Sequence, residues 1–200
     1  NFNVILNSRD KNKVDKRIFQ HNHIYRKESL IFNYRETEKQ SSLYSRISKK
    51  SQPLKSYAKV TTGIKPYQIG KGIPKQTKEI VQNKPFTSFE DKDGWLPLIR
   101  GTQINRYLTK WDGEFVNYGE WLAEPRQPII FLEPKLLIRR TDDNLLCSFD
   151  DKKYIGVNSV HCIQSIKNEI YNKYLLSLIN SKLCNWFFQH ENFHMVGKPL

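Results

Sequence analysis

The apolar residues of this chain come in short runs, and each run is soon ended by glycine, proline, aspartate or asparagine. The runs are rich in β-branched and aromatic residues, which is typical of strands, and breakers this frequent exclude long helices from the same region. The predicted strands lie at residues 95–100, 115–118, 129–132, 135–140, 145–149 and 154–163. Short strands joined by tight turns favour a twisted, mostly antiparallel sheet.

A helix is predicted after these strands. Asn168 is a good N-cap, and the apolar residues after it recur every three to four positions. That spacing puts them on one face, so we expect the face to lie in the core. The apolar positions are Ile170, Tyr174, Leu175, Leu178, Ile179, Leu183, Trp186 and Phe187.

The pattern of apolar residues, glycine and proline is different before residue 95. Residues 2–6 alternate loosely and predict a strand, whereas residues 34–56 predict an exposed helix that leads into a loop at Pro53. Glycine and proline recur through residues 63–74 with lysines among them, which indicates a long irregular loop. The fold class that we expect is α+β: a twisted, mostly antiparallel sheet with flanking helices.

The chain has 200 residues, of which 38% are hydrophobic and 12% aromatic, and this is enough for a packed core. No apolar run approaches the roughly 18 residues of a membrane helix, so we expect no membrane partner. The three cysteines cannot all pair internally and no secretory signal is present, which favours the cytoplasm. The chain starts at Asn1 rather than at a methionine, so we expect a piece of a longer protein.

Charge is the strongest compositional signal. The 33 lysines and arginines against 20 acidic residues give a formal net charge of +13, which favours a polyanionic partner. Residues 1–60 hold 14 basic and 5 acidic residues, compared with 19 and 15 in residues 61–200. The positive charge is therefore concentrated in the N-terminal third.

Common catalytic motifs are missing from the sequence. It has no C-x-x-C spacing for zinc, no phosphate-binding glycine loop and no G-x-S-x-G elbow. One alternative stays open, because Asp112 followed by Glu133 and Lys135 matches the short pattern of Mg²⁺-dependent nucleases. Pro134 breaks the strand that such a motif would occupy, which weakens this alternative.

Several segments, taken in order, resemble one protein family. They are VTTGIKPYQIGK at residues 60–71, PLIRGTQINRY at 97–107, YGEWLAEPRQP at 118–128, PKLLIRRT at 134–141 and YLLSLINSKL at 174–183. Their order and spacing are similar to those of the TaqI-like C-terminal specificity domain, the target-recognition domain of adenine DNA methyltransferases in type II and IIG restriction-modification systems. The resemblance also accounts for the nuclease-like pattern, because Lys135 belongs to the PKLLIRRT segment.

The resemblance implies a division of labour. Residues 54–200 would form the DNA target-recognition domain, truncated at its C-terminus, and residues 1–53 a linker or the tail of a preceding domain. The implied partners are double-stranded DNA and the methyltransferase domain of the same parent chain. The chain contains neither the N-P-P-Y tetrapeptide nor the glycine-rich S-adenosylmethionine motif, so we expect that domain to bind the cofactor and to methylate adenine at N6. Half of a type I specificity subunit is a second alternative, although no long heptad spacer is present.

Basic and polar side chains in the resembling segments are the DNA contacts that we expect. Arginine suits phosphates and guanine edges, and glutamine can read adenine. Arg100 and Arg106 rank first, although Arg100 can instead brace a loop. The full set is Lys65, Tyr67, Lys71, Arg100, Gln103, Arg106, Trp121, Arg126 and Arg140. We expect no catalytic residue, metal ligand or cofactor site in this chain.

Overall fold

The computed structural model describes residues 2–7, 14–19 and 37–192. The chain divides into two compact units, Asn1–Ser51 and Gln52–Leu200. In the first unit, β1 (Phe2–Asn7) pairs antiparallel with β2 (Val14–Phe19), which confirms the strand expected near the N-terminus. The helix α1 (Glu38–Lys50) is shorter than expected, because a capping box between Thr37 and Gln40 fixes its start.

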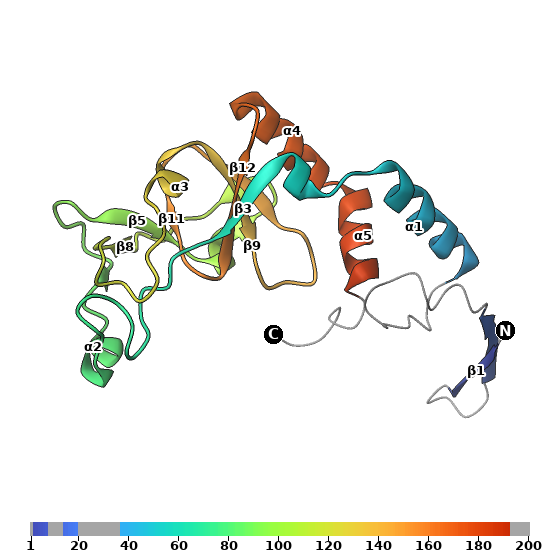
Figure 1. Ribbon diagram of the computed structural model, residues 1–200, viewed down its shortest axis with the longest axis horizontal. Coiled ribbons are helices and arrows are strands. Elements are labelled where there is room, and N and C mark those ends of the chain that lie inside the picture. Colours follow the sequence, from blue (N-terminus) through green and yellow to red (C-terminus); the bar gives the residue numbers. More distant parts are fainter. Residues whose placement is uncertain (1, 8–13, 20–36, 193–200) are drawn as a thin grey trace. The chain divides into compact units, whose positions relative to one another are not determined.

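A four-stranded antiparallel sheet lies at the centre of the second unit, in the order β10-β9-β12-β3 (Figure 1). Its strands are β3 (Ala58–Thr62), β9 (Lys135–Arg139), β10 (Cys147–Asp150) and β12 (Val160–Ser165). The register aligns Thr62, His161, Ile138 and Cys147 in one row across the sheet. We call this sheet the central sheet.

Shorter strands form a second sheet in the order β11-β5-β8-β4. Its strands are β4 (Thr87–Ser88), β5 (Leu96–Ile99), β8 (Phe115–Val116) and β11 (Ile155–Gly156), and only the β11–β5 pair among them is parallel. A separate hairpin consists of β6 (Ile104–Asn105) and β7 (Leu108–Thr109). Short helical segments connect the strands: η2 (Leu54–Ser56), α2 (Lys78–Asn83), η3 (Gly101–Gln103) and α3 (Ile129–Leu132). Helices beside antiparallel sheets confirm the α+β class.

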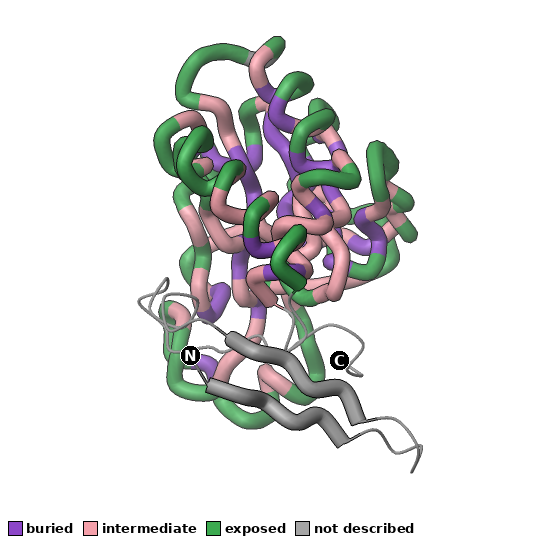
Figure 2. The backbone as a smooth tube through the Cα atoms, turned by 90° about the vertical axis from the view of Figure 1, so that its right-hand side faces the viewer, coloured by how far each residue is buried: buried purple, intermediate pink, exposed green. Residues whose placement is uncertain are grey.

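Alternation along the central sheet sends its side chains into two separate cores. Leu137 and Cys162 face one core, which they share with the second sheet and α3. Leu136 and Ile163 face the other core, against α4 (Glu169–Ile179). Buried positions therefore run through the interior of the unit while its loops stay exposed (Figure 2). Burial on both faces explains why apolar residues stand next to each other in the middle of these strands, Leu136 beside Leu137 in β9 and Cys162 beside Ile163 in β12.

The helix expected over residues 168–187 is in fact two helices, α4 and α5 (Lys182–Glu191). Ser181 caps the start of α5 with its hydroxyl, and Asn180 lies between the helices. The amide of Asn180 bonds both the N–H and the C=O of Cys147 in β10, at 3.1 and 2.8 Å. The Ser181 hydroxyl accepts the N–H of Cys184 at 3.1 Å and so begins a new helix directly after the residue that is fixed to β10.

The prediction of a wholly buried apolar stripe on this helix is wrong for several positions. The exposed fractions are 80% for Ile170, 53% for Tyr174 and 41% for Leu178, whereas Leu175 and Ile179 are buried. The row that contains Leu175 and Ile179 faces the sheet, and the neighbouring row faces outward. No helix in the described part of the chain is long and apolar enough to span a membrane.

Residues 129–132 form the helical turn α3, so the predicted strand there is wrong. The carbonyl of Pro128 accepts the N–H of Phe131 at 2.9 Å, which closes the turn. Ile130 and Phe131 are buried side by side, a pattern that a half-buried strand does not produce. A run of only four apolar residues has no clear period, so the sequence could not distinguish the two structures.

A buried ion pair connects β9 to β10. Lys135 and Asp150 face each other in register, and both side chains have zero exposure. The ammonium of Lys135 donates to the carboxylate of Asp150 and to the carbonyl of Phe131, the latter at 2.7 Å. Asp150 also accepts the backbone N–H groups of Lys152 and Tyr154 at 2.8 and 3.1 Å. The pair therefore fastens α3, the central sheet and the turn before β11 together.

We expect Lys135→Met to lower the free energy of unfolding by about 3–5 kcal/mol, because Asp150 then stays buried without its countercharge. Urea unfolding followed by tryptophan fluorescence measures this change. The exposed pair of Lys92 and Glu90, 3.5 Å apart, provides the control, and Lys92→Met is expected to cost less than about 1 kcal/mol. Equal effects of the two substitutions would contradict the supporting role of the buried pair.

Candidate nucleic-acid interface

Basic side chains gather where strands of the central sheet end. β3 ends at Thr62, and His161 occupies the paired position at the start of β12. Arg140 directly follows β9, and Arg126 reaches the end of β3 from the loop before α3. We call Arg126, His161 and Arg140 the strand-end cluster.

Hydrogen bonds fix each member of the strand-end cluster. Arg126 donates from Nε to the carbonyl of Thr62 at 3.1 Å, and the Thr62 hydroxyl lies 3.2 Å from Nδ1 of His161. Arg140 donates from Nη1 to the carbonyl of Asn158 at 3.2 Å. A guanidinium has five N–H donors, so both arginines keep donors for an anion from solvent.

His161 is a candidate that the sequence interpretation did not include. Partial burial, and then the positive charge of Arg140, lower the pKa of its imidazole below the ordinary value. The ring is therefore mostly neutral at neutral pH, and an anion beside it would favour protonation. Alternation in β12 is the signal that could have found it, because Cys162 enters the core and His161 points to the other face.

One buried glutamine shapes the loop between β3 and α2. Gln76 has an exposed fraction of only 2%. Its side-chain oxygen accepts the N–H of Gln68 at 2.9 Å, and its side-chain nitrogen donates to the carbonyls of Pro66 and Trp121, both at 2.8 Å. A single amide thus closes the loop on itself and fastens it to the segment around Trp121.

This loop holds Lys71 and Lys65 in different ways. The carbonyl of Lys71 accepts the N–H of Gln76 at 2.8 Å, whereas its exposed ammonium has no bonding partner among the described residues. The backbone of Lys65 pairs with that of Glu124 through bonds of 3.1 and 2.9 Å. Glu124 also binds Arg126 at 3.0 Å, so the loop is connected to the strand-end cluster.

Tyr67 and Trp121 have clear packing roles. The ring of Tyr67 stacks on Phe86 with centroids 5.6 Å apart, and its hydroxyl accepts the Phe86 N–H at 2.7 Å. Trp121 donates from Nε1 to the carbonyl of Asn117 at 3.0 Å. Its ring also needs glycine at position 119, because a Cβ on Gly119 would lie 2.4 Å from it. Base contacts by Tyr67 and Trp121 stay a prediction.

Arg100 braces a loop in this structure. Its Nε and Nη2 each donate to the carboxylate of Glu114 at 2.6 Å, and this bidentate pair raises the pKa of Arg100. Gln103 is buried, and its side-chain oxygen accepts the backbone N–H of Arg100 at 2.6 Å. Direct DNA contact by Arg100 and Gln103 stays a prediction, and it would require these internal bonds to open.

Arg106 occupies a different environment. It lies in the exposed two-residue turn between β6 and β7. Its side chain makes no hydrogen bond or ion pair with the part of the chain that the structure describes. The guanidinium is therefore available to an external anion.

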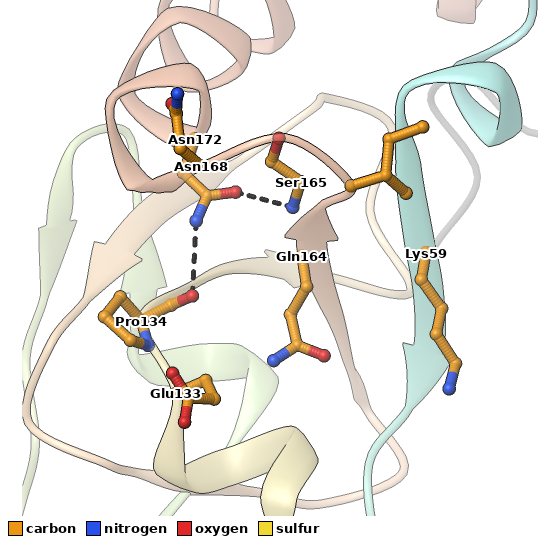
Figure 3. A pocket seen from close by; sticks show the side chains of 8 residues that line it. Lys59, Glu133, Pro134, Gln164, Ser165, Asn168 and Asn172 are labelled. Carbon is orange, nitrogen blue, oxygen red and sulfur yellow. Dashed lines mark hydrogen bonds between the residues drawn. The ribbon is translucent and has the colours of Figure 1, made fainter.

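The opposite end of the same strands forms a groove of about 540 Å³ (Figure 3). The groove is lined by Lys59, Glu133, Pro134, Gln164, Ser165, Ile166, Asn168 and Asn172. The amide of Asn172 accepts the N–H of Ser165 at 2.8 Å and donates to the carbonyl of Pro134 at 3.2 Å. Because one glutamate and one lysine share its lining, the groove lacks the positive charge of the strand-end cluster.

The three residues of the nuclease alternative lie in three different environments. Lys135 is buried against Asp150, Glu133 lies exposed at the groove, and Asp112 accepts the N–H of Glu114 at 3.3 Å in a turn. Within the described ranges, no group of three or more histidines, cysteines or acidic residues is placed to hold a metal ion. The lysine that the nuclease chemistry needs is therefore out of reach of a substrate.

This α+β domain carries arginines at its strand ends and a lysine-bearing loop braced by Gln76, an arrangement that suits an anionic partner. The comparison with protein families identifies it further. The model of the TaqI-like C-terminal specificity domain matches residues 96–195, half of the chain, and the chain belongs to this family. Such domains recognise DNA targets in restriction-modification enzymes. No curated protein matches the chain.

We expect Gln76→Ala to loosen the loop between β3 and α2, because three side-chain hydrogen bonds are lost and the N–H of Gln68 loses this acceptor, whereas the carbonyl of Pro66 keeps the N–H of Ala123. The free energy of unfolding should fall by about 2–3 kcal/mol. Hydrogen exchange of residues 66–76 should accelerate more than that of β9 and β12. The exposed Gln127→Ala is the control and should change stability by less than about 0.5 kcal/mol. Unchanged exchange in the loop would contradict the role of Gln76.

We expect acid to destabilise the protein partly through His161. Its pKa is lower in the folded than in the unfolded chain, so the unfolded chain binds more protons as the pH falls below about 6.5. This contribution to stability is complete above that pH and is lost as the pH falls through the lower folded pKa. Urea midpoints measured from about pH 7.5 to about pH 5 should fall more steeply for wild type than for His161→Asn. Parallel curves would contradict the expectation.

Proposed function

We propose that this chain is the sequence-specific DNA target-recognition domain of a type II restriction-modification enzyme, and that it directs N6-methylation of adenine by a catalytic domain of the same parent protein. The observation that carries the proposal is the strand-end cluster in a member of the TaqI-like specificity family. The formal charge of +13 supports a polyanionic partner.

In this proposal, Arg126 and Arg140 neutralise phosphates of one DNA strand. Their geometry is fixed in advance by bonds to backbone carbonyls, so little side-chain freedom is lost on binding. Lys71 approaches the phosphate backbone of the DNA from the loop that Gln76 holds in place. Phosphate contacts of this kind set the position of a protein on the duplex, and loop side chains then read the bases.

Catalysis is assigned to another domain of the parent protein. The sequence has neither the N-P-P-Y tetrapeptide nor the glycine-rich motif for S-adenosylmethionine, so no residue of this chain is assigned to the cofactor. The recognition domain holds the duplex and selects the site. The partner domain then takes the adenine out of the helix and transfers the methyl group.

The alternatives receive less support. The nuclease needs Lys135 at a substrate, and the structure buries this residue in an ion pair. Half of a type I specificity subunit would bind DNA in a similar way, but such subunits join their halves through long helices. The longest helix among the described residues is α1, with 13 residues.

The first test is fluorescence anisotropy of the full chain with random-sequence duplex DNA across about 50–200 mM salt. We expect the logarithm of affinity to fall linearly with the logarithm of salt concentration. Arg126→Gln and Arg140→Gln should each reduce the slope by about 1, because each removes one phosphate contact. The control is Lys92→Gln, which also removes one positive charge but at an exposed lysine outside the strand-end cluster, paired with Glu90.

The outcomes separate the functions. Unchanged slopes for both arginine variants would contradict the strand-end interface, and absence of binding at low salt would contradict the proposed function. Mg²⁺-dependent cutting that Glu133→Ala abolishes would instead support the nuclease. Sites enriched from a random duplex pool should contain an adenine that the parent protein methylates at N6.

A further inference from the structure

The turn between β6 and β7 exposes three consecutive large side chains. Tyr107 has an exposed fraction of 59%, Leu108 of 50%, and Arg106 is also exposed. The turn has two residues, because Asn105 pairs directly with Leu108. An aromatic ring, an aliphatic side chain and a cation thus share the tip of one hairpin.

Tyr107 occupies this tip in a backbone conformation that disfavours tyrosine. Its φ is +64°, in the left-handed region where glycine and asparagine are preferred. Lys84 also has a positive φ, but it ends α2, where this conformation is common. Lys153 has a positive φ as well, and a two-residue hairpin turn such as that of Tyr107 favours this conformation, so the turn accounts for the backbone but not for a tyrosine where glycine or asparagine is preferred. Strained positions of this kind concentrate at functional sites.

Hydrogen bonds with β10 and with Arg139 fix the β6–β7 hairpin in place. The N–H of Tyr107 donates to the carbonyl of Cys147 at 2.8 Å, and the hydroxyls of Thr109 and Ser148 lie 2.7 Å apart. Arg139 donates to the carbonyls of Gly101, Thr102 and Ile104 at 2.9, 3.2 and 3.0 Å. The exposed ring therefore sits on a fixed support rather than on a loose loop.

The register relates this tip to the strand-end cluster. Cys147, which binds the turn, lies in the same row of the central sheet as Ile138 and His161. Three inter-strand spacings separate the backbones of Tyr107 and His161 by about 14 Å. The major groove of DNA is about 12 Å wide, so the cluster can hold a phosphate strand while the turn lies over the base pairs.

We propose that the turn of Arg106, Tyr107 and Leu108 is a wedge that enters the duplex and stacks the ring of Tyr107 on a base whose partner is displaced. This inference rests on the proposed function, because it needs duplex DNA at the strand-end cluster. Apolar wedges of this type unstack base steps, and stacking on an aromatic ring tolerates any base. Arg106 supplies a neighbouring cation for the phosphate of the opened step.

The test compares two random-flanked duplexes, one fully paired and one with a single abasic site that leaves a base without its partner. The wild-type full chain should bind the abasic duplex about tenfold more tightly, because the cost of opening the pair has already been met. Tyr107→Asn should remove this preference, and Tyr107→Phe, which keeps the ring, should retain it. Tyr174→Ala, which removes a ring of 53% exposure on α4, should also retain it.

Asparagine is chosen because it tolerates a positive φ, so the melting temperature of Tyr107→Asn should not fall below that of wild type. A lower affinity is then not an unfolding effect. Equal wild-type affinity for the two duplexes, or an unchanged preference in Tyr107→Asn, overturns the wedge alone. Absence of binding to both duplexes at low salt overturns the proposed function as well.

Discussion

The antiparallel register of the central sheet is the constraint on which the rest of the structure depends. A shift of one residue would exchange the two faces of β9 and β12 and send Leu136 and Leu137 into the wrong cores. The ion pair of Lys135 and Asp150 opposes such a shift, since both charges would lose their partner. The same register determines that Thr62 and His161 meet at the strand ends.

Rigid support is the common theme of the candidate interface. Gln76 closes one loop with three side-chain bonds, and Arg139 caps the carbonyls beneath the β6–β7 hairpin. These internal hydrogen bonds fix the backbone from which the exposed lysines and arginines project. A preformed surface loses less conformational freedom when it binds a duplex.

The division between exposed and internal cations follows from acidic neighbours. Glu114 holds Arg100 in a bidentate pair, and Asp142 binds Arg139 at 2.6 Å. Arg106 lies in the same segment as Arg100, residues 97–107, and Arg140 in the same segment as Arg139, residues 134–141. Neither Arg106 nor Arg140 makes an ion pair within the described residues. In each of these two segments one arginine is therefore held inside the fold, Arg100 or Arg139, and the other is left without an acidic partner, Arg106 or Arg140, depending on which carboxylates the fold brings close.

Local patterns in the sequence determined the strands β5, β8, β9 and β10, the α+β class and the family, because alternation, turn residues and segment order are properties of the chain itself. Only the tertiary structure decided that residues 129–132 form a helix, that Asn180 divides the C-terminal helix, and that Arg100 faces Glu114. Each of these depends on a partner far away in the sequence or on burial, neither of which is written in local spacing. His161 belongs to the candidate site for the same reason: register across three strands, and not its sequence neighbours, places it beside Thr62 and Arg140.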